Sequence, residues 1–173
     1  MNKPDKTVTR SFRVNETALL AIEDEARRHN LSTNSFVNQL LLSYANYDRF
    51  MEKVHMIKMT TPGLRTLMEA GTDERLAEAG RIAGRSIGKS FIMARKGALS
   101  VENSIEQLRA MGDYANYWEF NEVNREGKKI ITLIHDLGPK GSLFLSGVGE
   151  ALFESAGIKP KFTTTDDSVI YEI

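Results

Sequence analysis

Residues 7–14, with the sequence TVTRSFRV, decide the fold of the N-terminal part of the chain because their side chains alternate in character. One side of the segment carries three apolar residues and one arginine: Val8, Arg10, Phe12 and Val14. The opposite side carries two hydroxyl residues and another arginine: Thr9, Ser11 and Arg13. Alternation of this kind predicts one short β-strand with an apolar side and a polar side.

Two helices are expected directly after this strand. Asn15 suits a helix N-cap, and apolar residues then recur at helical spacing as far as Asn30. Ser32 or Thr33 can cap a second amphipathic helix, whose apolar residues continue to Tyr47. The apolar stripe of this second helix is too wide for the first helix alone to cover.

A single strand leaves its backbone donors and acceptors without partners, so the N-terminal strand must pair with something. The other strands that the sequence predicts lie more than 50 residues downstream. The simplest partner is therefore the same strand of a second chain. The alternative is that residues 7–14 form an edge strand of the downstream sheet.

A strand, a helix, a short turn and a helix within residues 7–50 resemble the ribbon-helix-helix repressors of the Arc/MetJ type. The resemblance rests on the alternation at positions 9, 11 and 13, on the helical set Ala18, Ile22 and Ala26, and on the run NLSTNS at 30–35. It implies an intertwined homodimer. Two antiparallel strands would enter the DNA major groove, and the N-termini of the second helices would meet phosphates.

The side chains themselves suit these roles. Arginine donates two hydrogen bonds to guanine, and small hydroxyl groups donate or accept at base edges, so we expect base contacts from Thr9, Ser11 and Arg13. A helix N-terminus favours a phosphate through its free amides and its dipole. We expect phosphate contacts from Lys6, Arg10, Ser32, Thr33, Asn34 and Ser35. Arg10 lies on the apolar side of the strand, which leaves base contact open as an alternative for this residue.

Composition limits the class of protein. The 173 residues are 41% hydrophobic and 27% charged, which suits one domain or two small ones. The net charge is zero, but residues 1–14 contain four basic residues and one acidic residue. The chain has no cysteine, which excludes disulfides and thiolate metal sites. No apolar run approaches the roughly 18 residues of a membrane span, so we expect a cytoplasmic protein without a membrane partner.

The rest of the chain predicts a linker and a second domain. Residues 51–63 have a mixed pattern that ends in the turn-forming run TTPG, which indicates the linker. Residues 64–173 predict an α+β domain with an antiparallel sheet. Its helices are expected at 64–70, from 73 to 93 with a stop at Gly97, from Ser100 to Gly112, and at 142–156. Its strands are expected at 117–123 and 129–135, joined around Gly127, and at 161–165 and 168–173.

Three motifs in the second domain have both a structural and a functional interpretation. Gly80, Gly84 and Gly88 fall on one face of a helix, which indicates close packing against another element, with ligand contact as the alternative. Residues 83–90 resemble a phosphate-binding loop by accident, because no strand precedes them. His135 and Asp136 at a strand end are expected to be a capping pair rather than a reactive site.

The element order over 76–173 is similar to that of the vinyl-reductase-type small-ligand domains and of related vesicle-tethering scaffold subunits. The resemblance implies that this domain senses a small-molecule effector; an added contact that makes a higher oligomer is the other role we weigh. We therefore expect the whole chain to be a sequence-specific DNA-binding repressor, without catalytic residues, metal or cofactor. The alternative is the antitoxin of a toxin–antitoxin pair that regulates its own synthesis by binding DNA.

Overall fold

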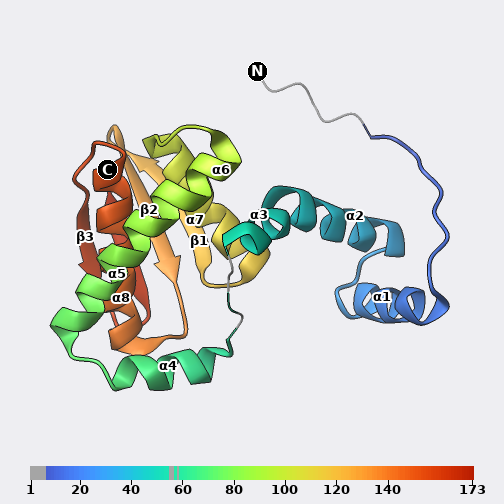
Figure 1. Cartoon of the computed structure of the whole chain (residues 1–173), viewed down its shortest axis with the longest axis horizontal. Helices are drawn as coiled ribbons and strands as arrows, with labels where there is room; N and C mark the ends of the chain where they lie inside the picture. The colour runs from blue at the N-terminus through green and yellow to red at the C-terminus, as the bar shows by residue number, and fades with distance from the viewer. Residues whose placement is uncertain (1–6, 55–56, 58) are drawn as a thin grey trace. The chain divides into compact units, whose positions relative to one another are not determined.

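The structure, a computed structural model, describes residues 7–54, 57 and 59–173. Two units with separate internal packing make up the chain: an N-terminal unit that ends at Ser43 and a C-terminal unit over Tyr44–Ile173. Helices occur in both units, and the C-terminal unit contains a four-stranded antiparallel sheet (Figure 1). The expected α+β class is thus confirmed.

The N-terminal unit contains the two helices that the sequence predicts, α1 (Glu16–Arg28) and α2 (Thr33–Ser43). The side chain of Asn15 accepts a hydrogen bond from the backbone N–H of Ala18 at 3.3 Å, which is the expected N-cap of α1. Asn30 has a φ of 55°, a conformation that asparagine tolerates well, and it turns the chain between the helices. Ser32, one of the two cap candidates, accepts from the N–H of Ser35 at 3.1 Å and so caps α2.

Residues 7–15 form no strand in the described chain, so the expected N-terminal ribbon is not seen. The physical reason is that a strand needs a neighbouring strand for its backbone hydrogen bonds, and a ribbon of two copies needs a second chain. The alternative of an edge strand in the downstream sheet is wrong, because that sheet consists of four strands that all lie within 119–172.

The C-terminal unit begins before the linker that was expected over 51–63. A π-helical turn (Tyr44–Asp48), helix α3 (Arg49–Met51) and a 3-10 turn (Glu52–Val54) come directly after α2. The rings of Tyr47 and Phe50 both pack against Phe91 in the hydrophobic core. Because these aromatic side chains are buried there, the segment that holds them belongs to the C-terminal unit.

The next helices agree with the sequence interpretation but differ at their ends. They are α4 (Thr61–Glu69), α5 (Asp73–Ser86), a π-helical turn (Ile87–Ile92), α6 (Met93–Lys96) and α7 (Val101–Ala115). Gly97, with a φ of 72°, ends α6 as expected. α7 is capped by Ser100 as expected, but it continues past Gly112 to Ala115, and its C-cap Asn116 adopts a left-handed conformation.

The sheet has the strand order β1-β2-β4-β3, with every neighbouring pair antiparallel. Its strands are β1 (Glu119–Arg125), β2 (Lys128–Ile134), β3 (Lys161–Thr164) and β4 (Ser168–Glu172). The turn between β1 and β2 consists of Glu126 and Gly127, with φ values of 52° and 80°. Two successive positive φ values are typical of a two-residue hairpin turn, so the predicted hairpin is confirmed with a shorter loop.

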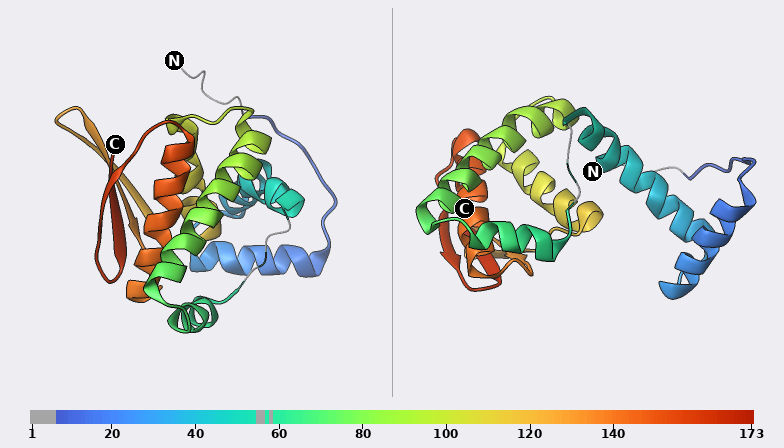
Figure 2. Two further views of the ribbon diagram at one scale, coloured as in Figure 1. Left: turned by 60° about the vertical axis from the view of Figure 1, so that its left-hand side comes forward. Right: turned by 60° about the horizontal axis from the view of Figure 1, so that its bottom comes forward.

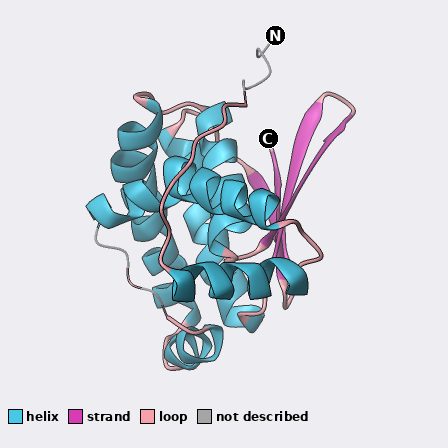
Figure 3. Ribbon diagram, turned by 90° about the vertical axis from the view of Figure 1, so that its right-hand side faces the viewer, coloured by secondary structure: helices cyan, strands magenta, loops and turns pink. Residues whose placement is uncertain are grey.

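Helix α8 (Gly138–Ser155) forms the middle layer of the C-terminal unit, between the sheet and α5 (Figure 2). Helices cover one face of the sheet (Figure 3). A Cβ atom at Gly80 or Gly84 would overlap the backbone of Phe144 or Val148 on α8. The close-packing interpretation of these two glycines is therefore confirmed.

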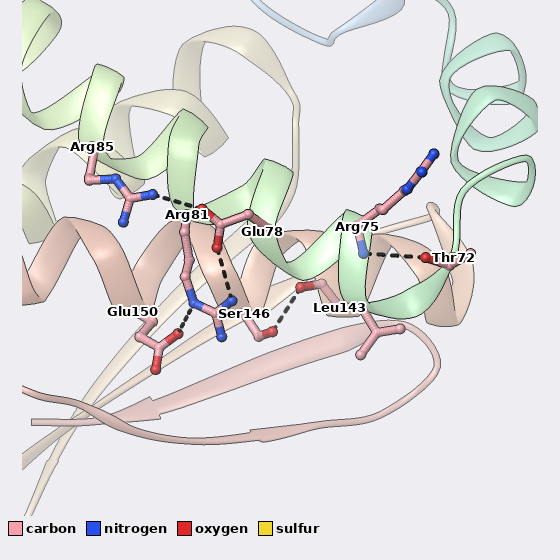
Figure 4. Close-up of polar contacts among 8 residues, drawn as sticks. All are labelled: Thr72, Arg75, Glu78, Arg81, Arg85, Leu143, Ser146 and Glu150. Atoms are coloured by element: carbon pink, nitrogen blue, oxygen red, sulfur yellow. Dashed lines mark hydrogen bonds and ion pairs between the residues drawn. The ribbon is translucent and has the colours of Figure 1, made fainter.

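Hydrogen bonds between charged side chains also connect α5 and α8 (Figure 4). The Nε of Arg81 on α5 donates to Glu150 of α8 at 2.8 Å. Glu78 accepts from both Arg81 and Arg85, so two arginines and two carboxylates form one network. The carboxylate of Glu150 raises the pKa of Arg81, because it stabilises the charged guanidinium.

Candidate functional site

The residues expected to contact DNA bases lie in the extended segment before α1. Thr9, Ser11 and Arg13 are all exposed, and the single chain does not hold them in a strand. Arg10 is exposed as well, and its guanidinium donates to the backbone oxygen of Thr9 at 3.2 Å. Lys6 lies outside the described residues.

The other expected phosphate contacts come together at the N-terminus of α2. Ser32, Asn34 and Ser35 are exposed there, and Thr33 is half-buried. The hydroxyl groups of Ser32 and Ser35 lie 2.8 Å apart, in addition to the capping bond. No acidic residue lies in the first turn of α2, so the positive end of the helix dipole is left uncompensated within this turn. The arrangement suits an anion.

The N-terminal unit leaves much of its apolar surface exposed. Ala26 is the one buried residue among the described residues 7–43. Phe12 is 76% exposed, and Val8, Val14 and Leu41 are each more than half exposed. Apolar side chains that a folded unit does not bury favour association, because burial removes their surface from water.

A cavity of about 1010 Å³ lies within the C-terminal unit, and no sequence motif indicated it. Its lining comes from segments that are far apart in the chain, including α4, α5, α7, α8 and the ends of β1 and β2. The lining includes four methionines: Met51, Met59, Met68 and Met111. Three aromatic residues near the start of β1 lie on the same lining: Tyr117, Trp118 and Phe120.

The hydroxyl of Tyr47 lies beside the phenol of Tyr117, and Nε2 of Gln107 has no hydrogen-bond partner among the described residues, although both groups are buried in the cavity lining. Tyr47 and Gln107 are only 3% and 1% exposed. Oε1 of Gln107 accepts from Arg95 at 3.3 Å. Because an arginine can only donate, this bond fixes which end of the Gln107 amide is the free donor.

The environment of the cavity shifts the pKa of the groups around it. Burial raises the pKa of Tyr47, and the neighbouring phenol of Tyr117 adds to the increase. Burial likewise raises the pKa of Tyr117. Burial lowers the pKa of Arg95, although Glu106 opposes this decrease. Both tyrosines are therefore neutral at neutral pH and can offer O–H donors.

His135, at the end of β2, is buried and has both ring nitrogens engaged. Its Nδ1 accepts from the backbone N–H of Leu137 at 3.2 Å, and its Nε2 lies 3.0 Å from the hydroxyl of Ser142. Burial lowers the pKa of His135 and so favours the neutral ring. Because Nδ1 accepts a hydrogen bond, the single proton of this neutral ring lies on Nε2. The lone pair of Nδ1 accepts from Leu137, so the neutral ring has no free lone pair that could take a proton from Ser142. A role as base toward Ser142 is therefore not available. His135 is thus a satisfied buried residue, whereas α8 has Leu137 as its N-cap without a side-chain capping bond, so the expected capping pair is not seen.

Another motif from the sequence and a lysine near the start of α8 have structural roles. Residues 83–90 are helical throughout, so they do not form a phosphate-binding loop. Lys140, near the start of α8, donates to the backbone oxygen of Gly71 and to the carboxylate of Asp73, at 2.8 and 2.7 Å. This lysine therefore ties the start of α8 to the start of α5.

Within the part of the chain that the structure describes, no group of three or more histidine or acidic residues is arranged to hold a metal ion. In the same part, no helix combines the length and the apolar character that a membrane crossing requires. Comparisons of the chain with protein-family models, with curated proteins and with solved structures found no match.

Proposed function

We propose that this chain is a sequence-specific DNA-binding regulator, a transcriptional repressor, that acts as a homodimer through a ribbon-helix-helix fold, which the sequence places at residues 1–50 and whose helices α1 and α2 end at Ser43, before the C-terminal unit begins. The C-terminal unit would modulate DNA binding, through an effector or a further contact between copies. The observation that carries the proposal is the unfinished packing of the N-terminal unit, in which Ala26 is the one buried residue among the described positions 7–43.

A second copy of the same chain would cover the exposed apolar residues with apolar residues of its own. An antiparallel copy of residues 7–14 has the same alternation, so it would place apolar residues beside Val8, Phe12 and Val14. The same dimer would bury the exposed leucines of α2, which include Leu40 and Leu41. Backbone hydrogen bonds between the two strands would satisfy groups that a lone segment leaves in water.

The polar side of the strand then faces outward, where DNA can reach it. An antiparallel pair of strands fits the major groove and would present Thr9, Ser11 and Arg13 from each chain. The uncompensated N-terminus of each α2 would bind a phosphate beside the groove. On α1, Asp24 and Glu25 form ion pairs with Arg27 and Arg28. Because these arginines are already paired, we expect the contact with DNA at the strand and at the N-terminus of α2, and not along α1.

The test is selection of duplexes from a random DNA pool by the full-length protein, followed by anisotropy titrations at fixed salt. We expect an enriched site with two symmetric halves. Arg13→Ala should weaken binding to that site by about 5- to 150-fold, the equivalent of about 1–3 kcal/mol, and reduce sequence preference. Asn34→Ala should weaken all duplexes alike, because it affects the contact with the phosphate backbone.

Arg27→Ala is the matched control, because Arg27 is another exposed arginine of the N-terminal unit and lies in the last turn of α1. We expect this variant to bind the selected site like the unsubstituted protein. Failure to enrich any sequence, or equal losses in Arg13→Ala and Arg27→Ala, contradicts the proposal.

A further inference from the structure

We propose that the cavity of the C-terminal unit binds an amphipathic small molecule with an apolar body, a cationic amine at one end and a hydrogen-bond acceptor at the other. This inference goes beyond DNA binding. Its test is carried out without DNA, so its outcome is separate from that of the proposed function.

The interior of the cavity is apolar and adaptable. Its volume of about 1010 Å³ lies at the upper end of the range for pockets that bind small molecules. Phe91, Leu145 and Val148 are each almost fully buried and line it. Methionine side chains are flexible and polarisable, so the four in the lining can adjust to the shape of a bound body.

The buried amide of Gln107 points to a polar group on the ligand. A buried donor without a partner costs about 1–3 kcal/mol, so a site that leaves one open gains from a ligand that accepts the bond. Nε2 of Gln107 is such a donor, since its amide oxygen is taken by Arg95. The hydroxyl of Tyr47 lies beside the phenol of Tyr117, so Gln107 is the donor that a ligand would satisfy. A carbonyl or ether oxygen on the ligand would accept this bond.

The charged residues of the lining are acidic and exposed, so we place them where the cavity opens to solvent. Three exposed carboxylates belong to the lining: Asp113 near the end of α7, Glu119 at the start of β1, and Asp136 just after β2. Glu119 pairs in register with Ile134, two residues before Asp136, so the two acids lie at the same end of the sheet. Among the described residues, none of these three carboxylates forms an ion pair, and the charged side chains in the lining are these acids.

Charge therefore selects the head group of the ligand. An ammonium at the opening is attracted by the three carboxylates, whereas a carboxylate or phosphate there is repelled. Gln107 and Asp113 lie six positions apart on α7, or about 9 Å along the helix axis. The cation and the acceptor of the ligand should be separated by a comparable length of apolar chain.

The experiment uses the full-length protein and simple probes in place of the unidentified ligand. The probes are decylamine, decanoate and methyl 10-aminodecanoate, all below their micelle concentrations. Trp118 is the single tryptophan of the chain and lines the cavity, so its fluorescence reports binding, with calorimetry as the second readout. We expect decylamine to bind about tenfold or more tightly than decanoate at neutral pH and low salt.

Three variants separate the parts of the proposal. Ala83→Phe fills part of the cavity from α5 and should abolish binding of every probe, with circular dichroism as the check on folding. The double variant Asp113→Asn, Asp136→Asn should reduce the preference for the amine to less than about threefold. Asp166→Asn is its control, because Asp166 is an exposed carboxylate of the β3–β4 turn and is not part of the cavity lining.

Gln107→Leu tests the acceptor. This variant should weaken methyl 10-aminodecanoate by about fivefold or more and leave decylamine within about twofold, because only the ester probe carries an acceptor. Decanoate binding as tightly as decylamine overturns the choice of a cation. Binding that survives Ala83→Phe in a folded protein, or absence of binding by all three probes, overturns the site itself. Equal effects of Gln107→Leu on both amines overturn the acceptor.

Discussion

The Nε of Arg81 on α5 donates to the carboxylate of Glu150 on α8 at 2.8 Å, across the helix pair whose backbones meet at Gly84. The ion pair and the close packing at Gly84 should differ in how much they stabilise the C-terminal unit. The ion pair is partly open to solvent, with the Arg81 side chain 38% exposed, whereas Gly84 is buried. Close packing should therefore contribute more to the stability of the C-terminal unit than the ion pair does.

Gly84→Ala should lower the free energy of unfolding by about 1–3 kcal/mol, although alanine favours helix formation over glycine by about 1 kcal/mol. The added Cβ would overlap the carbonyl of Val148, so α5 and α8 must move apart. Urea unfolding followed by circular dichroism measures the change. Ala79→Ser, at an exposed position of the same helix, should stay within about 0.5 kcal/mol. If Gly84→Ala were more stable than the unsubstituted protein, α5 and α8 would be able to move apart without a cost in the free energy of unfolding.

Glu150→Gln should lower the free energy of unfolding by about 0.5–1 kcal/mol, because it removes the charge that faces Arg81. The same urea experiment at low and high sodium chloride should show a smaller difference at high salt, since salt screens the exposed part of the pair. Glu78→Gln is a suitable comparison, because Glu78 is more exposed at 53% and should have a smaller effect. A loss that does not depend on salt would contradict an electrostatic origin.

His135 should make the protein less stable as the pH falls through the ordinary pKa of histidine, near 6.5. Burial lowers the pKa of His135 in the folded state, so the unfolded chain takes up a proton first and gains stability relative to the folded chain. The contribution is fully present above pH 6.5 and decreases below it, by up to about 1.4 kcal/mol at pH 5.5.

Urea midpoints at pH 7.5 and 5.5 measure this effect. His135→Asn should be less stable at both values but should lose less on acidification than the unsubstituted protein. If His135→Asn and the unsubstituted protein lose equal stability on acidification, the buried neutral histidine is not the cause.

Phe12→Asp should raise the dissociation constant of the dimer by at least about hundredfold, because each copy would lose the burial of one large apolar side chain and gain a charge in the interface. Sedimentation velocity over a concentration series measures it. Val123→Asp is the matched control, since Val123 is an exposed apolar residue of β1 in the other unit. A monomer in the unsubstituted protein, or equal effects of the two variants, contradicts dimerisation through residues 7–14.

Local signals predicted much of the fold. Asn15 and Ser100 cap helices because a short polar side chain before an apolar repeat satisfies free amides, whatever the rest of the chain does. Gly127 forms the turn of the hairpin for a similarly local reason, its positive φ. The continuation of α7 past Gly112 depends instead on packing: a Cβ at Gly112 would contact the carbonyl of Trp118 at 2.8 Å, so this glycine is kept for a close approach and not as a stop.

Long-range features could not be read from the sequence. Tyr47 belongs to the C-terminal unit because its ring meets Phe91 and Tyr114, which no local pattern near Tyr47 indicates. The cavity was missed for the same reason, since its lining is assembled from distant segments. Gln107 looks like an ordinary polar residue of an amphipathic helix. Only its burial and the bond to Arg95 mark its free amide.

The position of β4 between β2 and β3 has a consequence for the order in which this unit can form during synthesis. β3 has β4 as its one neighbour in the sheet, and β2 pairs on one side with β1 and on the other with β4. A nascent chain that has not yet reached Ser168 can build the β1–β2 hairpin but leaves the other side of β2 open, because the backbone groups of Ile130–Ile134 that pair with β4 still lack their partners. Closure of the sheet therefore waits for a pairing between strands distant in sequence, which is slow to form. Until then, the open edge of β2 is the place where a growing chain is most exposed to misassociation.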